Sequence, residues 1–208
     1  MRVLLVKTSS LGDLIHSFPA LSDASRALPG IRFDWLAEES FAEVPTWHPA
    51  VAKVIPIALR RWRRDWRKAW RSGQLKAFRA QLRATRYDLV LDAQGLVKSA
   101  LPAFLAQGPR AGLDGKSARE PLAARFYQHR YAVAREQHAI VRLRQLFAQA
   151  LGYPMPSGPA DYGLHFSQVH DAAVKRLILL HGTTWPSKHW PEYYWAGLAQ
   201  LAADKGFA

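Results

Sequence analysis

The sequence VLLVKTSSLGD, residues 3–13, places four apolar residues directly before a loop of small and polar residues. Such an apolar run is typical of a buried central strand in a parallel sheet. The loop would then follow the carboxyl end of that strand, where open α/β sheets bind their ligands. Gly12 permits a close turn, and Asp13 stands at the start of the next helix, expected over residues 14–28. The stretch therefore predicts an α/β fold with a site beside Asp13.

Asp13 itself has two interpretations. An aspartate at the start of a helix usually accepts hydrogen bonds from backbone N–H groups and complements the helix dipole, so its position alone favours a capping role. The alternative is a catalytic role at the ligand-binding edge. The loop has neither the G-x-G-x-x-G pattern of dinucleotide-binding proteins nor the G-K-[ST] of Walker loops, which disfavours those two nucleotide-binding classes.

Length, composition and charge limit the possible number of domains, class of protein and kinds of partner. The chain has 208 residues, 49% of them hydrophobic, enough for one large domain or one and a half. No apolar stretch approaches the roughly 18 residues of a membrane-spanning helix, and the N-terminus has no signal-peptide pattern. The absence of cysteine excludes disulfides and thiolate metal sites and agrees with a cytoplasmic location. The net charge of +13 favours phosphate-bearing partners, either nucleic acid or anionic lipid.

Strands and helices are expected to alternate along the chain, which is the pattern of βαβ units around a parallel sheet. The expected strands cover residues 31–36, 51–57, 87–92 and 110–113, and the expected helices cover residues 41–47, 74–85, 97–105 and 137–151. We therefore predict a Rossmann-like N-terminal domain with a parallel sheet over residues 1–152.

A linker is predicted over residues 153–170, because three prolines and two glycines between Gly152 and Pro159 cannot continue a helix or a central strand. Beyond it, a strand over residues 176–181, a loop over residues 182–188 and a helix over residues 191–205 begin a second unit. One strand and one helix cannot bury a core on their own. Residues 171–208 are therefore expected to be the start of an incomplete second domain.

Residues 60–71, RRWRRDWRKAWR, combine seven cations with three tryptophans spaced four residues apart. A continuous helix would place Trp62, Trp66 and Trp70 on one face and the cations opposite. The tryptophans are then either core residues beneath a solvated basic face, or part of a surface that binds an anionic partner. The seven cations repel one another, and Asp65 is the one acidic residue in the segment that offsets this repulsion. We therefore favour the anionic partner. Nucleic acid is not expected, since no nucleic-acid-binding motif accompanies the segment.

Five segments resemble the heptosyltransferase I family of lipopolysaccharide biosynthesis, in glycosyltransferase family 9. They are VKTSSLGD (6–13), RRWRR (60–64), DAQGLVKS (92–99), AREPLA (118–123) and TTWPSKHWP (183–191), and DAQGLVKS is highly specific. The resemblance spans essentially the whole chain. It implies an inverting GT-B enzyme, with an acceptor-binding N-terminal domain and a second Rossmann-like domain for the donor. The implied reaction moves L-glycero-D-manno-heptose from ADP-heptose to the inner Kdo sugar of Kdo2-lipid A.

The resemblance also implies residue roles. Asp13 matches the family's catalytic base, and a carboxylate that takes the acceptor proton late in the reaction can still cap its helix. Thr183, Thr184 and Lys188 match residues that contact the donor phosphates. For Gln94 a simple β–α turn, and for His138 a plain helix start, remain alternatives. The implied acceptor-binding residues are Lys7, Arg60, Arg61, Arg63, Arg64, Gln94, Lys98, Arg119 and His138.

Further expectations concern partners and completeness. No cofactor and no metal at the reacting centre are expected, with ADP-heptose acting as a substrate and positive groups in place of a metal. The expected location is the cytoplasmic face of the inner membrane, as a peripheral protein. The 208-residue piece is expected to be inactive alone. Two alternatives stay open: a heptosyltransferase for a later core acceptor, which the arginines at 60–64 disfavour, and a non-enzymatic module that binds membrane or nucleic acid.

Overall fold

The computed structural model describes residues 1–164, 175–182 and 186–207. Its internal contacts divide the chain into two compact units, Met1–Leu164 and His165–Ala208. The division falls inside residues 153–170, the range in which the sequence predicts a linker. Tyr153, Tyr162 and Leu164 pack against the core of the first unit. The role of the range as a linker between two whole domains stays a prediction.

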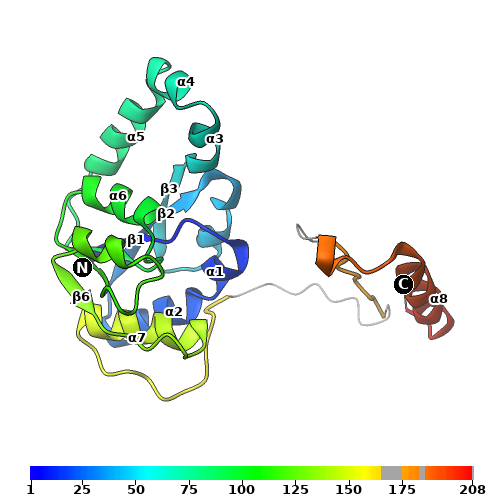
Figure 1. Ribbon diagram of the computed structural model, residues 1–208. Helices are drawn as coiled ribbons and strands as arrows, with labels where there is room; N and C mark the ends of the chain where they lie inside the picture. The colour runs from blue at the N-terminus through cyan, green and yellow to red at the C-terminus, as the bar shows by residue number, and fades with distance from the viewer. Residues whose placement is uncertain (165–174, 183–185, 208) are drawn as a thin grey trace. The chain divides into compact units, whose positions relative to one another are not determined.

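The first unit is built on a six-stranded parallel sheet with the order β3-β2-β1-β4-β5-β6 (Figure 1). The strands are β1 (Arg2–Val6), β2 (Arg32–Glu38), β3 (Val51–Ile57), β4 (Leu89–Asp92), β5 (Arg110–Leu113) and β6 (His129–Tyr131). This confirms the predicted α/β fold with a parallel sheet. The chain runs outward from β1 to β3 and then returns to the other side of β1 with β4, so the strand order reverses between β1 and β4. Open α/β sheets bind ligands at such a reversal.

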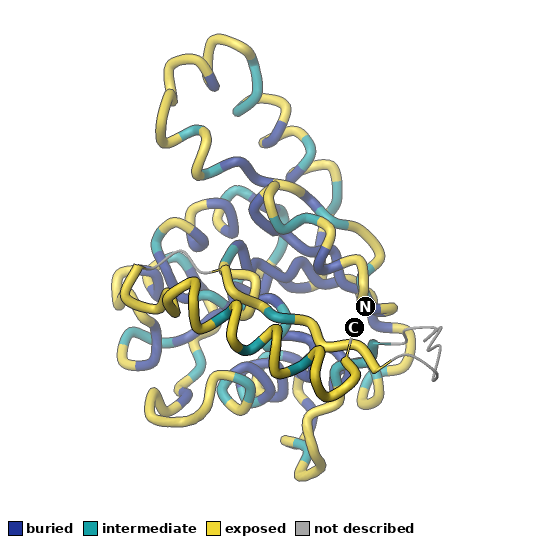
Figure 2. Tube along the Cα trace, turned by 90° about the vertical axis from the view of Figure 1, so that its right-hand side faces the viewer, coloured by how far each residue is buried: buried dark blue, intermediate teal, exposed yellow. Residues whose placement is uncertain are grey.

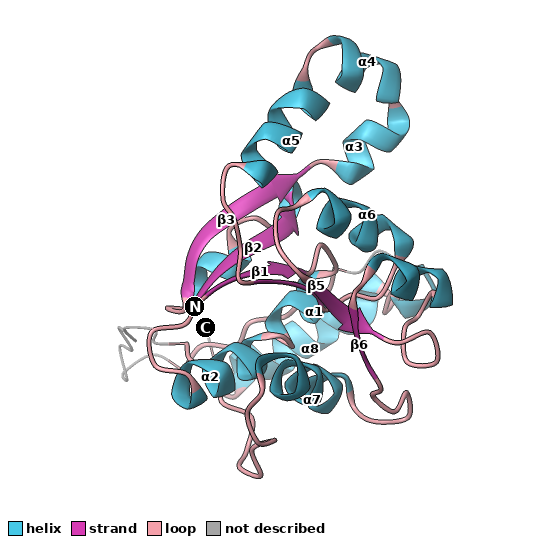
Figure 3. Ribbon diagram, turned by 90° about the vertical axis from the view of Figure 1, so that its left-hand side faces the viewer, coloured by secondary structure: helices cyan, strands magenta, loops and turns pink. Residues whose placement is uncertain are grey.

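The strand β1 is central because its side chains are apolar on both faces. Leu4 and Val6 belong to the cluster beneath α5 (Gln74–Arg83) and α6 (Val97–Leu105), whereas Val3 and Leu5 belong to the cluster beneath α2 (Phe18–Ala27) and α7 (Ala139–Leu151). Figure 3 shows these two helix layers on opposite faces of the sheet. The four apolar side chains of β1 are fully buried. Dark blue marks the buried parts of the chain in Figure 2.

The predicted helix over residues 14–28 is wrong in detail, because two helices occupy this region. Helix α1 (Leu11–Ile15) ends early, and α2 begins at Phe18 with Pro19 in its first turn. Proline lacks a backbone N–H and is favoured in the first turn of a helix, where that donor has no partner within the helix, and this accounts for the new start. The helix expected over residues 41–47 is likewise replaced by two 3-10 turns, η1 (Glu39–Phe41) and η2 (Val44–Trp47).

The continuous helix predicted over residues 60–71 is also wrong. Asp65 leaves the helical conformation with φ −149° and ψ 79°, and separates α3 (Leu59–Arg64) from α4 (Trp66–Arg71). Its carboxylate accepts a hydrogen bond from the Lys68 backbone N–H at 2.9 Å and so caps α4. The tryptophans therefore do not share one face. Trp62 packs against Phe78 at 5.3 Å between ring centroids, while Trp66 and Trp70 are exposed.

The second unit has less regular structure in the parts described. Helix α8 (Glu192–Asp204) forms where a helix was predicted, with Pro191 directly before it. The strand predicted over residues 176–181 does not form, since no described residue pairs with that segment and a strand requires a partner. Two further 3-10 turns are η3 (Pro121–Phe126) in the first unit and η4 (Pro186–Lys188) in the second. Among the described helices, none has the length and apolarity needed to cross a membrane.

Candidate functional site

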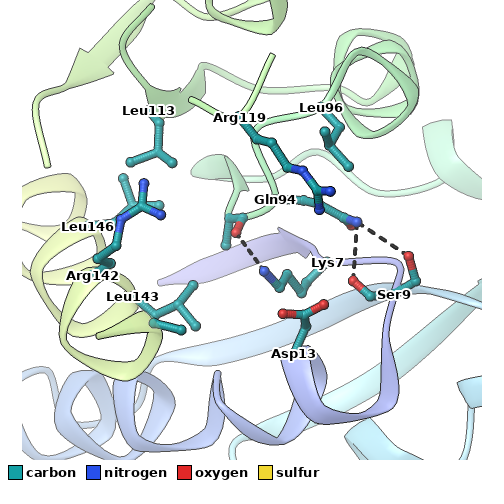
Figure 4. Close-up of a pocket in the computed structure, with 12 residues that line it drawn as sticks. Lys7, Ser9, Asp13, Gln94, Leu96, Leu113, Arg119, Arg142, Leu143 and Leu146 are labelled. Carbon is teal, nitrogen blue, oxygen red and sulfur yellow. Dashed lines mark hydrogen bonds between the residues drawn. The ribbon is translucent and has the colours of Figure 1, made fainter. Parts of the chain in front are cut away.

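A cavity of about 200 Å³ lies beside the reversal point of the sheet (Figure 4). Its walls come from the loops after β1, β4 and β5 and from the first turns of α7. Its charged and polar lining residues are Lys7, Ser9, Asp13, Gln94, Arg119 and Arg142, and leucine and alanine side chains complete it. Four of the predicted site residues, Lys7, Asp13, Gln94 and Arg119, are thus brought together from the segments that follow three different strands, with Asp13 in α1.

Asp13 is the one carboxylate in this lining. It is the third residue of α1, with Ser10 as the N-cap, so it is one turn further into the helix than a cap. Its Oδ2 accepts hydrogen bonds from the Ser10 backbone N–H at 2.7 Å and from the Ser10 hydroxyl at 3.0 Å. Burial acts to raise the pKa of Asp13, but the backbone bond from Ser10, the charge of Lys7 and the Ser10 hydroxyl together hold it below its usual value. The side chain is therefore ionised at neutral pH.

Lys7 is the buried cation of the cavity, with 8% of its surface exposed. It follows β1 directly, and its Nζ donates a hydrogen bond to the Ala93 carbonyl at 3.2 Å, after β4. Burial lowers the pKa of Lys7, and the negative charges of Asp13 and Asp92 oppose that effect while Arg142 adds to it. Figure 4 shows the Lys7 ammonium directed at the Ala93 carbonyl, with the Asp13 carboxylate beside the Lys7 side chain. Each group thus favours the charged form of the other.

Gln94 joins the loops after β1 and β4. Its Oε1 accepts hydrogen bonds from the Thr8 backbone N–H at 2.7 Å and the Thr8 hydroxyl at 2.8 Å. Its Nε2 donates to the Ser9 carbonyl at 3.1 Å. These bonds fix the loop that leads to Asp13, so Gln94 has a definite positioning role beyond that of a simple turn.

Asp92 is fully buried at the end of β4 and holds the backbone of Gln94 in place. Its Oδ1 accepts hydrogen bonds from the backbone N–H groups of Gln94 and Gly95, at 2.8 and 3.2 Å. Its Oδ2 accepts from the hydroxyls of Ser99 at 2.8 Å and Tyr127 at 2.6 Å. Burial raises the pKa of Asp92, against the effect of these donors. Sequence reasoning placed Asp92 in the segment 92–99 but gave it no role.

Arg142 is the charged residue of the cavity that sequence reasoning missed. One of its terminal nitrogens donates to the Ser117 carbonyl at 2.8 Å, while its Nε is buried without a hydrogen-bond partner among the described residues. Burial lowers the pKa of Arg142, and the positive charge of Arg135 lowers it further. The sequence did offer one sign of it: Arg142 follows the predicted site residue His138 by four residues in a predicted helix, which places both on the same helix face. Together with Lys7 and Arg119, it gives the cavity three cations around one carboxylate.

Two other predicted acceptor residues lie next to the cavity. Lys98, on α6, has its Nζ 3.4 Å from the Ser9 hydroxyl. His138 is the N-cap of α7, and its Nδ1 accepts a hydrogen bond from the Ile140 backbone N–H at 3.3 Å. Its ring lies 6.0 Å from that of His16 between centroids. The capping role of His138 is therefore present, and its exposed ring leaves an acceptor role open as a prediction.

The four predicted arginines of α3 do not line this cavity. Helix α3 follows β3 and so begins at the same edge of the sheet, on the far side of β2 from Lys7. Arg61 forms an ion pair with Glu39 at 2.9 Å, and the guanidinium of Arg60 lies over the Phe41 ring at 5.1 Å. Arg63 and Arg64 are exposed and take part in no ion pair among the described residues.

The predicted donor residues belong to the second unit. Lys188 ends η4 and is exposed. Thr183 and Thr184 lie outside the described residues. Within the ranges 1–164, 175–182 and 186–207, no three His, Cys, Asp or Glu side chains are grouped so that they could hold a metal ion.

Comparison with protein families gives one match. The model described as "Glycosyltransferase family 9 (heptosyltransferase)" matches residues 75–208, more than half of the chain. Two similar curated proteins carry the name lipopolysaccharide heptosyltransferase 1. The protein from Pseudomonas aeruginosa is 58% identical over 100% of this chain and 59% of its own length. The protein from Escherichia coli K12 is 51% identical over 99% of this chain and 66% of its own length.

Solved structures give the same picture of the fold. E. coli heptosyltransferase WaaC with ADP matches with a TM-score of 0.94 at 51% identity, over 100% of this chain and 66% of that one. The same enzyme with ADP-2-deoxy-2-fluoro heptose matches with a TM-score of 0.95, at 50% identity and over 67% of its chain. E. coli heptosyltransferase II, at 20% identity and a TM-score of 0.75, shares the fold. The chain thus spans about two thirds or less of the curated relatives' length.

Proposed function

Because this chain belongs to glycosyltransferase family 9, the heptosyltransferases, we propose that the whole protein transfers L-glycero-D-manno-heptose from ADP-heptose to Kdo2-lipid A, with inversion at the anomeric carbon. Two observations on relatives support the choice of substrates. Similar curated proteins carry the name lipopolysaccharide heptosyltransferase 1, and two similar solved structures are named as holding ADP or a fluorinated ADP-heptose. The acceptor would be the inner Kdo sugar.

The observation that carries the proposal is the cavity with one carboxylate among three cations at the carboxyl edge of the sheet. A sugar transfer needs a group that accepts the proton of the attacking hydroxyl. A Kdo acceptor also carries a carboxylate, which needs positive partners. The cavity supplies both kinds of group within one small volume.

In the proposed mechanism Asp13 is the general base. The acceptor hydroxyl oxygen forms a bond to the anomeric carbon of heptose while the bond from that carbon to the ADP phosphate oxygen breaks on the opposite face. The hydroxyl proton passes to Asp13, and ADP leaves with the electron pair. Both hydrogen bonds from Ser10 fall on Oδ2, so Oδ1 is the oxygen left to take the proton. A low-pKa carboxylate accepts it only late, once the new bond has formed in part.

The acceptor would be held by charge-assisted hydrogen bonds. Lys7, Arg119 and Arg142 face the cavity and suit the Kdo carboxylate. Gln94, Lys98 and His138 are in or next to the same wall and can bind sugar hydroxyls. The α3 arginines, Arg60, Arg61, Arg63 and Arg64, lie further along the same edge and suit the lipid A phosphates.

The donor would be held by the second domain. We assign its phosphates to Thr183, Thr184 and Lys188, and propose that such positive and hydrogen-bonding groups stabilise the leaving diphosphate without a bound metal. The rate should then survive addition of a metal chelator. Because the acceptor is a membrane lipid, the protein would work as a peripheral protein at the inner-membrane surface.

The substitution Asp13→Ala in the whole protein tests the mechanism. We expect kcat to fall by about 100-fold or more, because general-base catalysis contributes roughly that much. The KM for Kdo2-lipid A should change little, since the cations that hold the acceptor remain. Transfer can be followed by ADP release. A variant with a near-normal kcat would reject Asp13 as the base, and circular dichroism would show whether the variant keeps its overall fold.

A further inference from the structure

The segment from α3 to α5, residues 59–83, projects away from the sheet and is called here the basic arm (Figure 1). Most of its surface is exposed, as the yellow trace in Figure 2 shows. Its base is anchored to the sheet by Phe78 and Leu82, which are buried in the core, and by Trp62. Helix α4 lies at its far end, with only Ala69 buried.

Two large aromatic side chains are exposed at this far end. Trp66 and Trp70 are 56% and 67% exposed. Their rings stack on each other, with 6.2 Å between centroids and 18° between planes. They lie one helical turn apart on α4 and so form a single apolar surface at the far end of the arm. Tryptophan carries an apolar ring and a polar N–H, which suits the boundary between water and lipid.

The charges around this pair have one sign. Ten cations occupy the arm, and Asp65 is its one acidic residue; the cations are Arg60, Arg61, Arg63, Arg64, Arg67, Lys68, Arg71, Lys76, Arg79 and Arg83. Within the described residues, Arg61 is the one member of the arm that forms an ion pair, with Glu39. Arg67 instead lies over the Trp66 ring at 5.8 Å. The arm therefore presents a largely uncompensated positive field around two exposed rings, which calls for an anionic and partly apolar partner.

We propose that the basic arm docks on an anionic lipid bilayer, with Trp66 and Trp70 inserted at the level of the head groups and the surrounding cations on lipid phosphates. Helices that bind in the membrane interface likewise combine large apolar side chains with surrounding basic residues. Single-stranded nucleic acid also stacks on tryptophan, but it follows a basic groove. Here the rings stand on a projecting tip and already stack on each other, which favours the bilayer.

This inference rests on the proposed function in one respect, the lipid nature of the acceptor. Docking at the tip would place α3, which adjoins α4 across Asp65, close to the head groups. The arginines proposed to bind lipid A phosphates would then meet them without the acceptor leaving the membrane. Docking should raise the rate of transfer to an acceptor in a bilayer and leave the rate of transfer to an acceptor free in water unchanged.

The test compares the whole protein with the double variant Trp66→Ala/Trp70→Ala. Neither ring is buried, so folding should be retained. The matched control is Leu101→Ala/Leu122→Ala, which removes two apolar side chains that are 49% and 50% exposed outside the arm. Binding is measured by cosedimentation with vesicles of phosphatidylglycerol and phosphatidylcholine, and insertion by tryptophan quenching with brominated lipid. Heptosyl transfer is measured in parallel with a water-soluble Kdo acceptor that lacks acyl chains.

We expect the double variant to bind these vesicles about tenfold more weakly or worse, because two large apolar side chains no longer leave water. It should also lose quenching by brominated lipid, while the control variant and transfer to the soluble acceptor stay near wild-type values. Equal vesicle binding by both variants would overturn the proposal. Rings shielded from acrylamide in the free protein would also overturn it, because the protein itself would then cover them. So would a loss of affinity for single-stranded DNA, measured in parallel, without a loss of affinity for the vesicles. Failure of wild-type transfer would count against the proposed function alone, since vesicle binding is measured separately.

Discussion

Asp13 can hold the start of its helix and still serve as the proposed base, because the two tasks use different oxygen atoms. Ser10 binds Oδ2 twice, and Lys7 supplies a positive charge nearby. These groups keep the carboxylate ionised, as a base must be before it accepts a proton. They also make it a weak base, so the proposed proton transfer belongs to a late stage of bond formation.

The pH dependence of the rate should report this environment. With the pKa of Asp13 below its usual value, kcat/KM should fall with decreasing pH only as the carboxylate becomes protonated, at a pH below the ordinary aspartate range. Ser10→Ala removes the hydroxyl donor that lowers this pKa, so the acidic limb should move to higher pH. Ser17→Ala is the control, since the Ser17 hydroxyl binds the Asp13 carbonyl at 3.0 Å and not its carboxylate. Identical limbs in all three proteins would contradict this assignment.

Arg142 should contribute to acceptor binding and not to the chemical step. Its buried Nε lacks a partner in the described parts of the chain, so an acceptor carboxylate would supply one. Loss of a charge-assisted hydrogen bond costs roughly 1.5–3 kcal/mol, so Arg142→Gln should raise the KM for Kdo2-lipid A about tenfold or more with little change in kcat. The control is Arg32→Gln, because Arg32 is the first residue of β2 and lies at the amino end of the sheet, away from the cavity. A lowered kcat at constant KM would assign Arg142 a different role.

Single residues were predicted best where a local pattern marks them. The loop 7–13 follows an apolar strand, so the position of Asp13 could be predicted, and the family resemblance supplied its proposed role. Arg142 could not be predicted in the same way. Its importance depends on the distance between α7 and the loops after β1 and β5, which no local pattern contains.

At the scale of elements, strands with continuous apolar runs were predicted correctly, and local side-chain chemistry caused the errors. β1 and β4 are buried on both faces, so hydrophobicity alone marks them. The prediction of one helix over residues 60–71 was wrong at Asp65. The helical spacing of the tryptophans gives no information about a side chain that caps the following helix, as Asp65 does. The short edge strand β6 was missed, since three residues, His129–Tyr131, carry too little pattern.

The strand β5 supports the site through Gly112. A Cβ added at Gly112 would lie 2.5 Å from the buried Tyr127 ring, whose hydroxyl binds Asp92. Gly112→Ala should therefore destabilise the fold by roughly 1–3 kcal/mol, as overpacking does, and loosen the loop that Asp92 and Gln94 hold. Urea unfolding measures the first effect. Gly115→Ala is the control, because its added Cβ would approach no atom closer than 3.8 Å. Equal stability of the two variants would show that Tyr127 shifts without cost.

At the scale of the molecule, sheet topology decides which distant segments meet. The parallel order β3-β2-β1-β4-β5-β6 brings the loops that carry Lys7, Asp13, Gln94 and Arg119 to one edge. The sequence predicted a parallel sheet, but strand order follows from packing that a single chain's pattern does not reveal. The chain spans 59% and 66% of two curated relatives, and the proposed donor site and turnover concern the whole protein.

The choice of acceptor tests the central claim most directly. The whole protein is incubated with ADP-heptose and either Kdo2-lipid A or Kdo2-lipid A that already carries the first heptose, and lipid mass and ADP release are followed. We expect Kdo2-lipid A to gain one heptose for each ADP released, and the heptosylated lipid to remain unchanged. Extension of the heptosylated lipid alone would assign the protein to a later step. No transfer to either acceptor would contradict the proposed function.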